Sequence, residues 1–284
     1  MKMWSTQRIS PGHYQLFALL LLSATLTGCR PRADVFPIPT QTYTLPANHK
    51  LVILMDQASL ELVGHNGPDL SFVGSGSEPN LEISLMTLEG EPSTQLQLGR
   101  TSAAGPVNIV LQLRIPNGTQ VDLYLSKGDV YAHDIEGQLD LQTISASIRV
   151  EGFSGNLRAE SRRGVVQVSD SQGEIHTLAE ADEIRLSNLS GNITGTNIMG
   201  NINLSGMIND GDSTRLETDH GAVNIDLDPG SEAQISITSA GGRILCTLPG
   251  MSGMFDSCEG MLGSGSGILN IRTVSGAIHI DQTR

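Results

Sequence analysis

Residues whose side chains could do acid–base chemistry recur at a fixed step between residues 131 and 203. If eighteen residues make one coil of a repeat, a single outward column holds Tyr131, Arg149, Gln167, Arg185 and Asn203. His133 and Glu151 would lie beside this column, and Arg158 would lie near Asp140 and Glu160 on a second sheet. Carboxylates paired on such a face could act on a polysaccharide by acid–base catalysis. We favour cross-strand ion pairs that keep a polar face soluble, and therefore expect no catalytic residue and no enzyme.

Oxygen ligands for a metal gather at Asp210-Gly211-Asp212, with Glu217 and Asp219 following closely in the chain. Hard oxygen donors of this kind could take calcium, but a solvated acidic turn is the interpretation we favour. Histidines are spread along the chain after residue 28, at His49, His65, His133, His176, His220 and His279. No two of them have the H-x-x-x-H spacing of a metal site. We therefore expect no metal and no cofactor, and leave calcium at Asp210 and Asp212 open.

The first thirty residues carry a different chemistry. A weakly basic start precedes an apolar run over residues 16–22, which is too short to span a bilayer and has the size of a signal-peptide core. The run leads into Leu26-Thr27-Gly28-Cys29, which resembles the lipobox of bacterial lipoproteins. That resemblance implies cleavage before Cys29 and its acylation, as with palmitate; the alternative is a secretory signal with a chance cysteine. Arg30 stands where an aspartate would signal inner-membrane retention, so we expect a lipid anchor in the outer membrane.

Two further cysteines, Cys246 and Cys258, remain after Cys29. An even pair in an exported chain indicates a disulfide, and two free thiols are the alternative. The segment between them combines glycine with Met251, Met254 and Phe255. Flexible apolar side chains suit an adaptable contact surface, so these three residues are candidate partner contacts. The alternative is a loop tip folded onto the end of the domain.

A nine-residue repeat organises the chain from Gly128 to Gly200, and seven of its nine step positions are glycine. Two residues after each step the side chain is aliphatic: Val130, Leu139, Ile148, Leu157, Val166, Ile175, Ile184, Ile193 and Ile202. Polar residues alternate with this column, which is the pattern of half-buried strands. Two units would make a two-sided coil, and three units a three-sided one. We predict an all-β fold, an elongated β-solenoid of nine-residue half-coils over residues 50–284, with irregular ends.

Composition supports this class and limits the partners. Glycine accounts for 32 of the 284 residues and aromatics for only 4%, which is typical of many short strands and tight turns. The formal net charge of −13 would repel nucleic acid, so a nucleic-acid-binding role is excluded. Residues 1–28 are predicted to be a signal peptide, and the proline-bearing stretch 29–49 a lipidated, extended tether.

Several segments together resemble the DUF4097 family, which carries the label "putative adhesin". They are Ile115-Pro116-Asn117-Gly118, Val121-Asp122-Leu123, Ser126-Lys127-Gly128-Asp129-Val130, Leu141-Gln142-Thr143-Ile144-Ser145 and Arg272-Thr273-Val274-Ser275-Gly276-Ala277-Ile278. The resemblance covers roughly residues 50–284. It implies a β-strand repeat fold, often at a cell envelope, and supplies neither catalytic residues nor a binding site.

From these features we expect a lipid-anchored protein of a bacterial cell envelope. Its non-catalytic β-solenoid would serve adhesion or protein interaction, with an unidentified protein or glycan as partner. An accessory role in envelope-stress sensing is the alternative, and a polysaccharide-active β-helix enzyme is less favoured.

Overall fold

The computed structural model describes residues 35–46, 49–79, 81–87, 92–99, 107–253 and 256–282. The chain divides into two compact units, Met1–Asp34 and Val35–Arg284, and every described residue belongs to the second. The predicted signal peptide and Cys29 therefore lie outside the described residues, as do Met254 and Phe255. Within the described ranges, no helix is long and apolar enough to cross a membrane.

The twenty strands of the described residues are hydrogen-bonded into one long sheet, which confirms the prediction of an all-β protein. The N-terminal strands are β1 (Phe36–Thr44), β2 (Lys50–His65), β3 (Asp69–Gly76), β4 (Glu82–Thr87), β5 (Ser93–Gly99) and β6 (Ile109–Pro116). The middle of the sheet contains β7 (Gln120–His133), β8 (Glu136–Glu151), β9 (Ser154–Ser161), β10 (Val166–Ala179) and β11 (Ile184–Asn197). The C-terminal strands are β12 (Ile202–Gly206), β13 (Ser213–Thr218), β14 (Val223–Leu227), β15 (Ala233–Ser239), β16 (Ile244–Cys246), β17 (Ser252–Gly253), β18 (Ser257–Leu262), β19 (Gly267–Thr273) and β20 (Ile278–Gln282).

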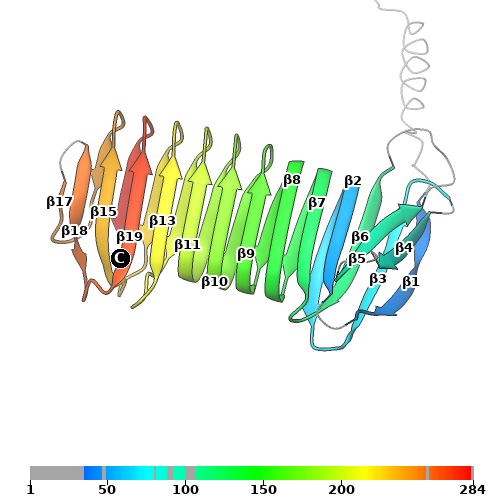
Figure 1. Ribbon diagram of the computed structural model, residues 1–284. Helices are drawn as coiled ribbons and strands as arrows, with labels where there is room; N and C mark the ends of the chain where they lie inside the picture. The colour runs from blue at the N-terminus through cyan, green and yellow to red at the C-terminus, as the bar shows by residue number, and fades with distance from the viewer. Residues whose placement is uncertain are drawn as a thin grey trace, which may run out of the picture. The chain divides into compact units, whose positions relative to one another are not determined.

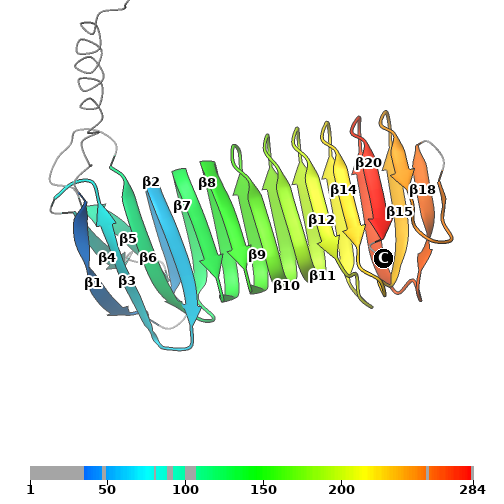
Figure 2. The same cartoon turned by 180° about the vertical axis from the view of Figure 1, so that it is seen from behind.

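Long strands turn a corner midway and so contribute to two faces. The first part of β10 pairs in parallel with β8, whereas its second part pairs with β9. Parallel partners in this region are eighteen residues apart, as Val166 and Ile184 show. Figure 1 looks onto β9, β13 and β19, and Figure 2 looks onto β12, β14 and β20. We name these two surfaces the β13 face and the β14 face.

The core between the faces is made by the aliphatic column that the repeat predicted. All nine residues, from Val130 to Ile202, are at most 2% exposed. On the β14 face, Ile148 is the register partner of Val130 and of Val166, so like side chains stack directly on one another. Each such side chain gains about 1.5–3 kcal/mol by leaving water. A thin core of this kind needs branched aliphatic residues and has little room for aromatic rings.

The corners bring backbone directly onto backbone. Gly173 has a φ of 121°, and a Cβ there would overlap the carbonyl oxygen of Gly155 in the preceding coil. At the other end of the coils, a buried hydroxyl accepts the glycine N–H three residues later. Thr273 Oγ1 accepts from Gly276 at 2.8 Å, and Ser239 Oγ accepts from Gly242 at 2.7 Å. These side chains satisfy backbone donors that the strand ladders cannot reach.

The C-terminal strands are inserted between earlier ones. β19 pairs with both β13 and β15, and β20 pairs with both β14 and β16. In Figure 1 the red β19 accordingly lies between the yellow β13 and the orange β15. The end of the stack is formed by β15 and β16 with the antiparallel β17 and β18.

The folded unit begins earlier than the sequence predicted. Residues 36–44, assigned to an extended tether, form β1, which pairs antiparallel with β3. Ile38 is only 2% exposed, because it packs into the N-terminal end of the core. Pro37 and Pro39 lack the N–H that a further strand would need, which suits an edge strand.

Gly173→Ala should lower the free energy of unfolding by about 3 kcal/mol, because the new Cβ meets an immovable backbone carbonyl. Gly211→Ala is the control, since Gly211 also has a positive φ but its Cβ would meet nothing within 4 Å. That control should lose about 1 kcal/mol. Urea unfolding of the two variants measures the difference, and equal losses would contradict backbone stacking at the corners.

Candidate functional site

Outward side chains of the β14 face form two adjacent columns. Strand register places the residues of the first column in the order Tyr131, Arg149, Gln167, Arg185, Asn203, Asn224 and His279. Those of the second column are His133, Glu151, Ser169, Ser187, Ser205, Asp226 and Asp281. The predicted outward column from Tyr131 to Asn203, with His133 and Glu151 beside it, is therefore confirmed.

The structure extends this column by Asn224 and His279, which the eighteen-residue step missed. The step from Asn203 to Asn224 is 21 residues, and His279 arrives on the inserted strand β20. A signal was nevertheless present in the sequence, because Asn203, Asn224 and His279 each stand three residues after Gly200, Gly221 or Gly276.

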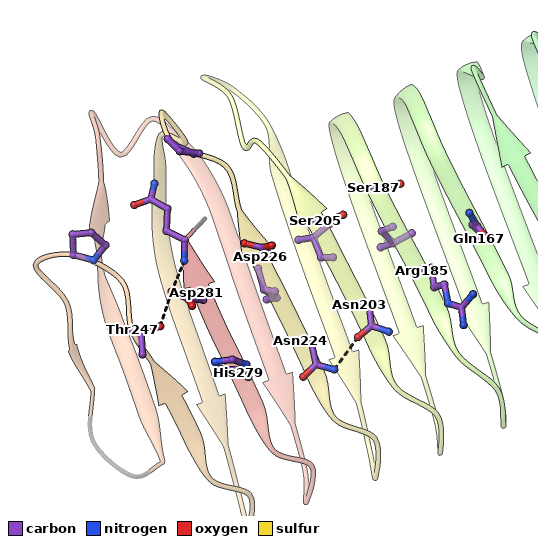
Figure 3. A pocket seen from close by; sticks show the side chains of 16 residues that line it. Gln167, Arg185, Ser187, Asn203, Ser205, Asn224, Asp226, Thr247, His279 and Asp281 are labelled. Atoms are coloured by element: carbon purple, nitrogen blue, oxygen red, sulfur yellow. Dashed lines mark hydrogen bonds between the residues drawn. The ribbon is translucent and has the colours of Figure 1, made fainter. Parts of the chain in front are cut away.

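A groove of about 1260 Å³ lies over the C-terminal part of the two columns. Its lining includes the first-column residues Gln167, Arg185, Asn203, Asn224 and His279 and the second-column residues Ser187, Ser205, Asp226 and Asp281. Figure 3 shows these side chains on successive strands, with Thr247 at the C-terminal end. Pro229 and Pro249 add apolar surface to the lining. The small serines of the second column leave space between the longer side chains around them.

Hydrogen bonds hold the groove side chains in place. Arg185 Nε donates to Glu183 Oε2 at 2.7 Å, and Asn203 Nδ2 donates to the other oxygen of the same carboxylate. Asn224 Nδ2 donates to Asn203 Oδ1 at 2.8 Å, as Figure 3 shows. At the far end, Thr247 Oγ1 donates to Asp281 Oδ1 at 2.9 Å. The amides are thus oriented by neighbours on adjacent strands, and each has further donor and acceptor positions.

The N-terminal part of the same columns is a network of paired side chains. Tyr131 Oη donates to Glu151 Oε2 at 3.0 Å, and Arg149 donates to the same oxygen at 3.1 Å. The Tyr131 and His133 rings stack with centroids 4.8 Å apart. Desolvation by burial, together with Glu151, raises the pKa of Tyr131 above its usual value. The Glu151 carboxylate thus accepts hydrogen bonds from both Tyr131 and Arg149.

Most arginine–carboxylate pairs run along a strand, which corrects the expectation of cross-strand pairs. Arg149 pairs with Glu151, Arg158 with Glu160, Arg185 with Glu183 and Arg215 with Glu217. Residues two apart point to the same side of a strand, so a long guanidinium reaches its neighbour easily. On the β13 face, Asp140 is the register partner of Arg158, as predicted. Lys50 and Asp122, 2.9 Å apart, do form a cross-strand pair.

The acidic turn has a structural role at Asp212. Its carboxylate is largely buried and accepts the Gly191 N–H at 2.7 Å. It also accepts the backbone N–H and the side-chain amide of Asn209, both at 2.9 Å. Three donors therefore surround a side chain that the sequence offered as a calcium ligand. In the described part of the chain, no group of three or more His, Cys, Asp or Glu side chains could hold a metal ion.

Cys246 and Cys258 are joined as a disulfide with Cα atoms 6.5 Å apart. The bond connects β16, the last strand of the β14 face, to β18 at the end of the β13 face. Met251 between them is half-buried and packs against the core. The other two candidate partner contacts, Met254 and Phe255, are outside the described residues.

Reduction should lower the free energy of unfolding by about 3 kcal/mol, because the bond closes a loop of twelve residues in the unfolded chain. Thiol titration of the mature chain, unfolded but not reduced, should find no free thiol, and two should appear after reduction. Two reactive thiols before reduction would contradict the bond.

Comparison with known proteins found no matching family model and no matching curated protein. Nine chains among the solved structures match. One is a "putative adhesin" from Bacteroides fragilis, with 13% identity over 89% of this chain and 100% of that chain and a TM-score of 0.45. A "putative cell adhesion protein" from Clostridium sporogenes has 14% identity over 87% of this chain and 100% of that chain, with a TM-score of 0.27. A "putative adhesin" from Parabacteroides merdae has 9% identity over 89% of this chain and 98% of that chain, with a TM-score of 0.31.

These neighbours are bacterial proteins named as adhesins. Because the three TM-scores lie below 0.5, we transfer no function from them to this chain. The resemblance to DUF4097 remains a prediction from the sequence segments.

Proposed function

We propose that this protein is a lipid-anchored component of a bacterial cell envelope, held at the outer membrane, that uses a non-catalytic β-solenoid for adhesion or protein interaction. The groove of the β14 face is the observation that carries this proposal. It gathers uncharged and charged hydrogen-bonding side chains from five successive parallel strands into one surface. The eighteen-residue offset of the strand partners supports nine-residue half-coils as its building unit.

The arrangement of the acidic side chains supports binding rather than catalysis. Three glutamates each accept a hydrogen bond from an arginine two residues away and so orient its guanidinium: Glu151, Glu160 and Glu183. In the groove, the Asp281 carboxylate accepts the Thr247 hydroxyl. The groove is also an open surface on the face of the sheet rather than a cleft that encloses a ligand.

The segment before the folded unit supports the anchor. A short apolar run ends at the lipobox-like Leu26-Thr27-Gly28-Cys29, and the first strand begins at Phe36. Multiple acyl chains on Cys29 would hold the protein stably at a bilayer.

Cys29→Ala should move the protein from the membrane pellet to the soluble fraction, because the acyl acceptor is lost. The paired variant Cys246→Ser with Cys258→Ser is the control and should stay with the membrane, since only Cys29 directly follows the signal segment. Fractionation followed by immunoblotting measures the distribution. Retention of the Cys29→Ala protein in the pellet would overturn the anchor.

The groove should be required for contact with the cell envelope. Immobilised full chain should retain sonicated envelope fragments, and the pair Asn203→Ala with Asn224→Ala should lose most of that retention. The pair Asn156→Ala with Asn270→Ala is the matched control, because both residues are exposed on strands of the β13 face. Equal retention by the two pairs would show that the groove is not the contact surface.

A further inference from the structure

We propose that the groove of the β14 face binds a linear glycan that is neutral or carries amino groups, with the chain lying along the column from Gln167 to His279. This inference rests on the proposed function, because it names the ligand class of the same surface. It is drawn from the spacing, chemistry and charge of the lining side chains.

The spacing fits a polymer that crosses the strands. Gln167, Arg185, Asn203, Asn224 and His279 lie on neighbouring parallel strands in one register column. Adjacent strands are about 4.8 Å apart, so the five residues span about 19 Å. One strand spacing is close to the length of one sugar ring in an extended chain. Each ring of a linear glycan would therefore lie between two neighbouring rungs, and the four intervals of the column accommodate about four rings.

The side-chain types fit hydroxyl-rich ligands. A sugar hydroxyl both donates and accepts a hydrogen bond, and so does the amide of Asn or Gln. Asn203 and Asn224 are already oriented by their mutual hydrogen bond and by Glu183. Ser187 and Ser205 beside them add short hydroxyls that leave room for a ring. At the C-terminal end, His279 has the half-exposed Leu245 as its register partner, and an imidazole ring beside an aliphatic side chain suits the C–H side of a sugar.

The charges select against anionic polymers. Arg185 is ion-paired with Glu183, and the groove lining also contains the carboxylates of Asp226 and Asp281. The whole chain has a formal net charge of −13. Nucleic acids and acidic glycans would be repelled from such a surface, whereas neutral or protonated amino sugars would not.

A peptide occupant fits the groove less well. The groove lies on the face of the sheet and not at its edge. The backbone N–H and C=O groups beneath it are already paired between strands, so a peptide cannot add as a further strand. Peptide-binding surfaces depend on aromatic and arginine anchors in desolvated pockets. The lining contains no Phe, Tyr or Trp, and its one arginine, Arg185, is ion-paired with Glu183.

The test titrates the full chain with purified oligosaccharides of one to six units, using calorimetry. The panel contains neutral cello-oligosaccharides, amino-bearing chitosan oligosaccharides and acidic oligogalacturonates, and hexalysine represents a basic peptide. A neutral or amino series should bind, with an affinity that rises up to about four units and then levels off. Asn203→Ala and Asn224→Ala should each weaken it by about tenfold. Asn156→Ala and Asn270→Ala should leave it unchanged.

Several results would overturn the ligand class: binding of none of the sugars, binding of the acidic series alone, length-independent affinity, or preference for hexalysine. Loss of envelope retention in the groove variants together with no sugar binding would leave the proposed function standing and remove the glycan. Sugar binding in the groove with unaffected envelope retention would support the glycan ligand and show that the groove is not the envelope contact. Release of shorter oligosaccharides during the titration would overturn the non-catalytic role while keeping the glycan.

Discussion

The structure depends on the close stacking of one coil's backbone on the next at the corners. Where Gly173 passes over Gly155, and where Gly276 passes over Gly221, no side chain can stand between the two backbones. At the Gly276 end of the coils, the buried Thr273 and Ser239 hydroxyls complete the corners by accepting the N–H groups of Gly276 and Gly242. Because the corners fix the strands at the ordinary inter-strand spacing, the side chains of parallel strands lie over their register partners in the next coil. The aliphatic core and the outward polar columns are two results of that single constraint.

Strand register makes the outward columns of such a surface regular. The chemistry of the surface then depends on which residue type each coil contributes to a given column. Toward the N-terminal end of the β14 face, Tyr131, Arg149 and Glu151 satisfy one another. Toward the C-terminal end, amides, serines and a histidine line an open groove. The inserted strand β20 completes that groove, since it brings His279 and Asp281 next to Asn224 and Asp226. The ends of the sheet differ from its parallel middle, because they contain antiparallel strands: β1 and β3 at one end, and β17 and β18 at the other.

The repeat could be predicted from the sequence because it depends only on the spacing of nearby residues. The burial of Val130 to Ile202 and the outward column from Tyr131 to Asn203 both follow from a nine-residue step with alternating polarity. The position of β19 and β20 does not follow, because their glycine and aliphatic pattern is the same whether they end the stack or enter it. The pattern also did not predict β1, because its prolines are typical of an extended tether. Nor did it predict the role of Asp212, because the carboxylate accepts its hydrogen bond from the Gly191 N–H, which lies in an earlier coil.

In our proposal, the polar column over the C-terminal half of the β14 face is the contact surface of this protein. Side-chain amide signals in the nuclear magnetic resonance spectrum of the ¹⁵N-labelled protein test this assignment during titration with solubilised envelope glycan from the source organism. We expect the Asn203 and Asn224 signals to shift in a saturable manner while those of Asn156 and Asn270 stay in place. Shifts confined to the β13 face, or no shift of Asn203 and Asn224 at saturation, would contradict it.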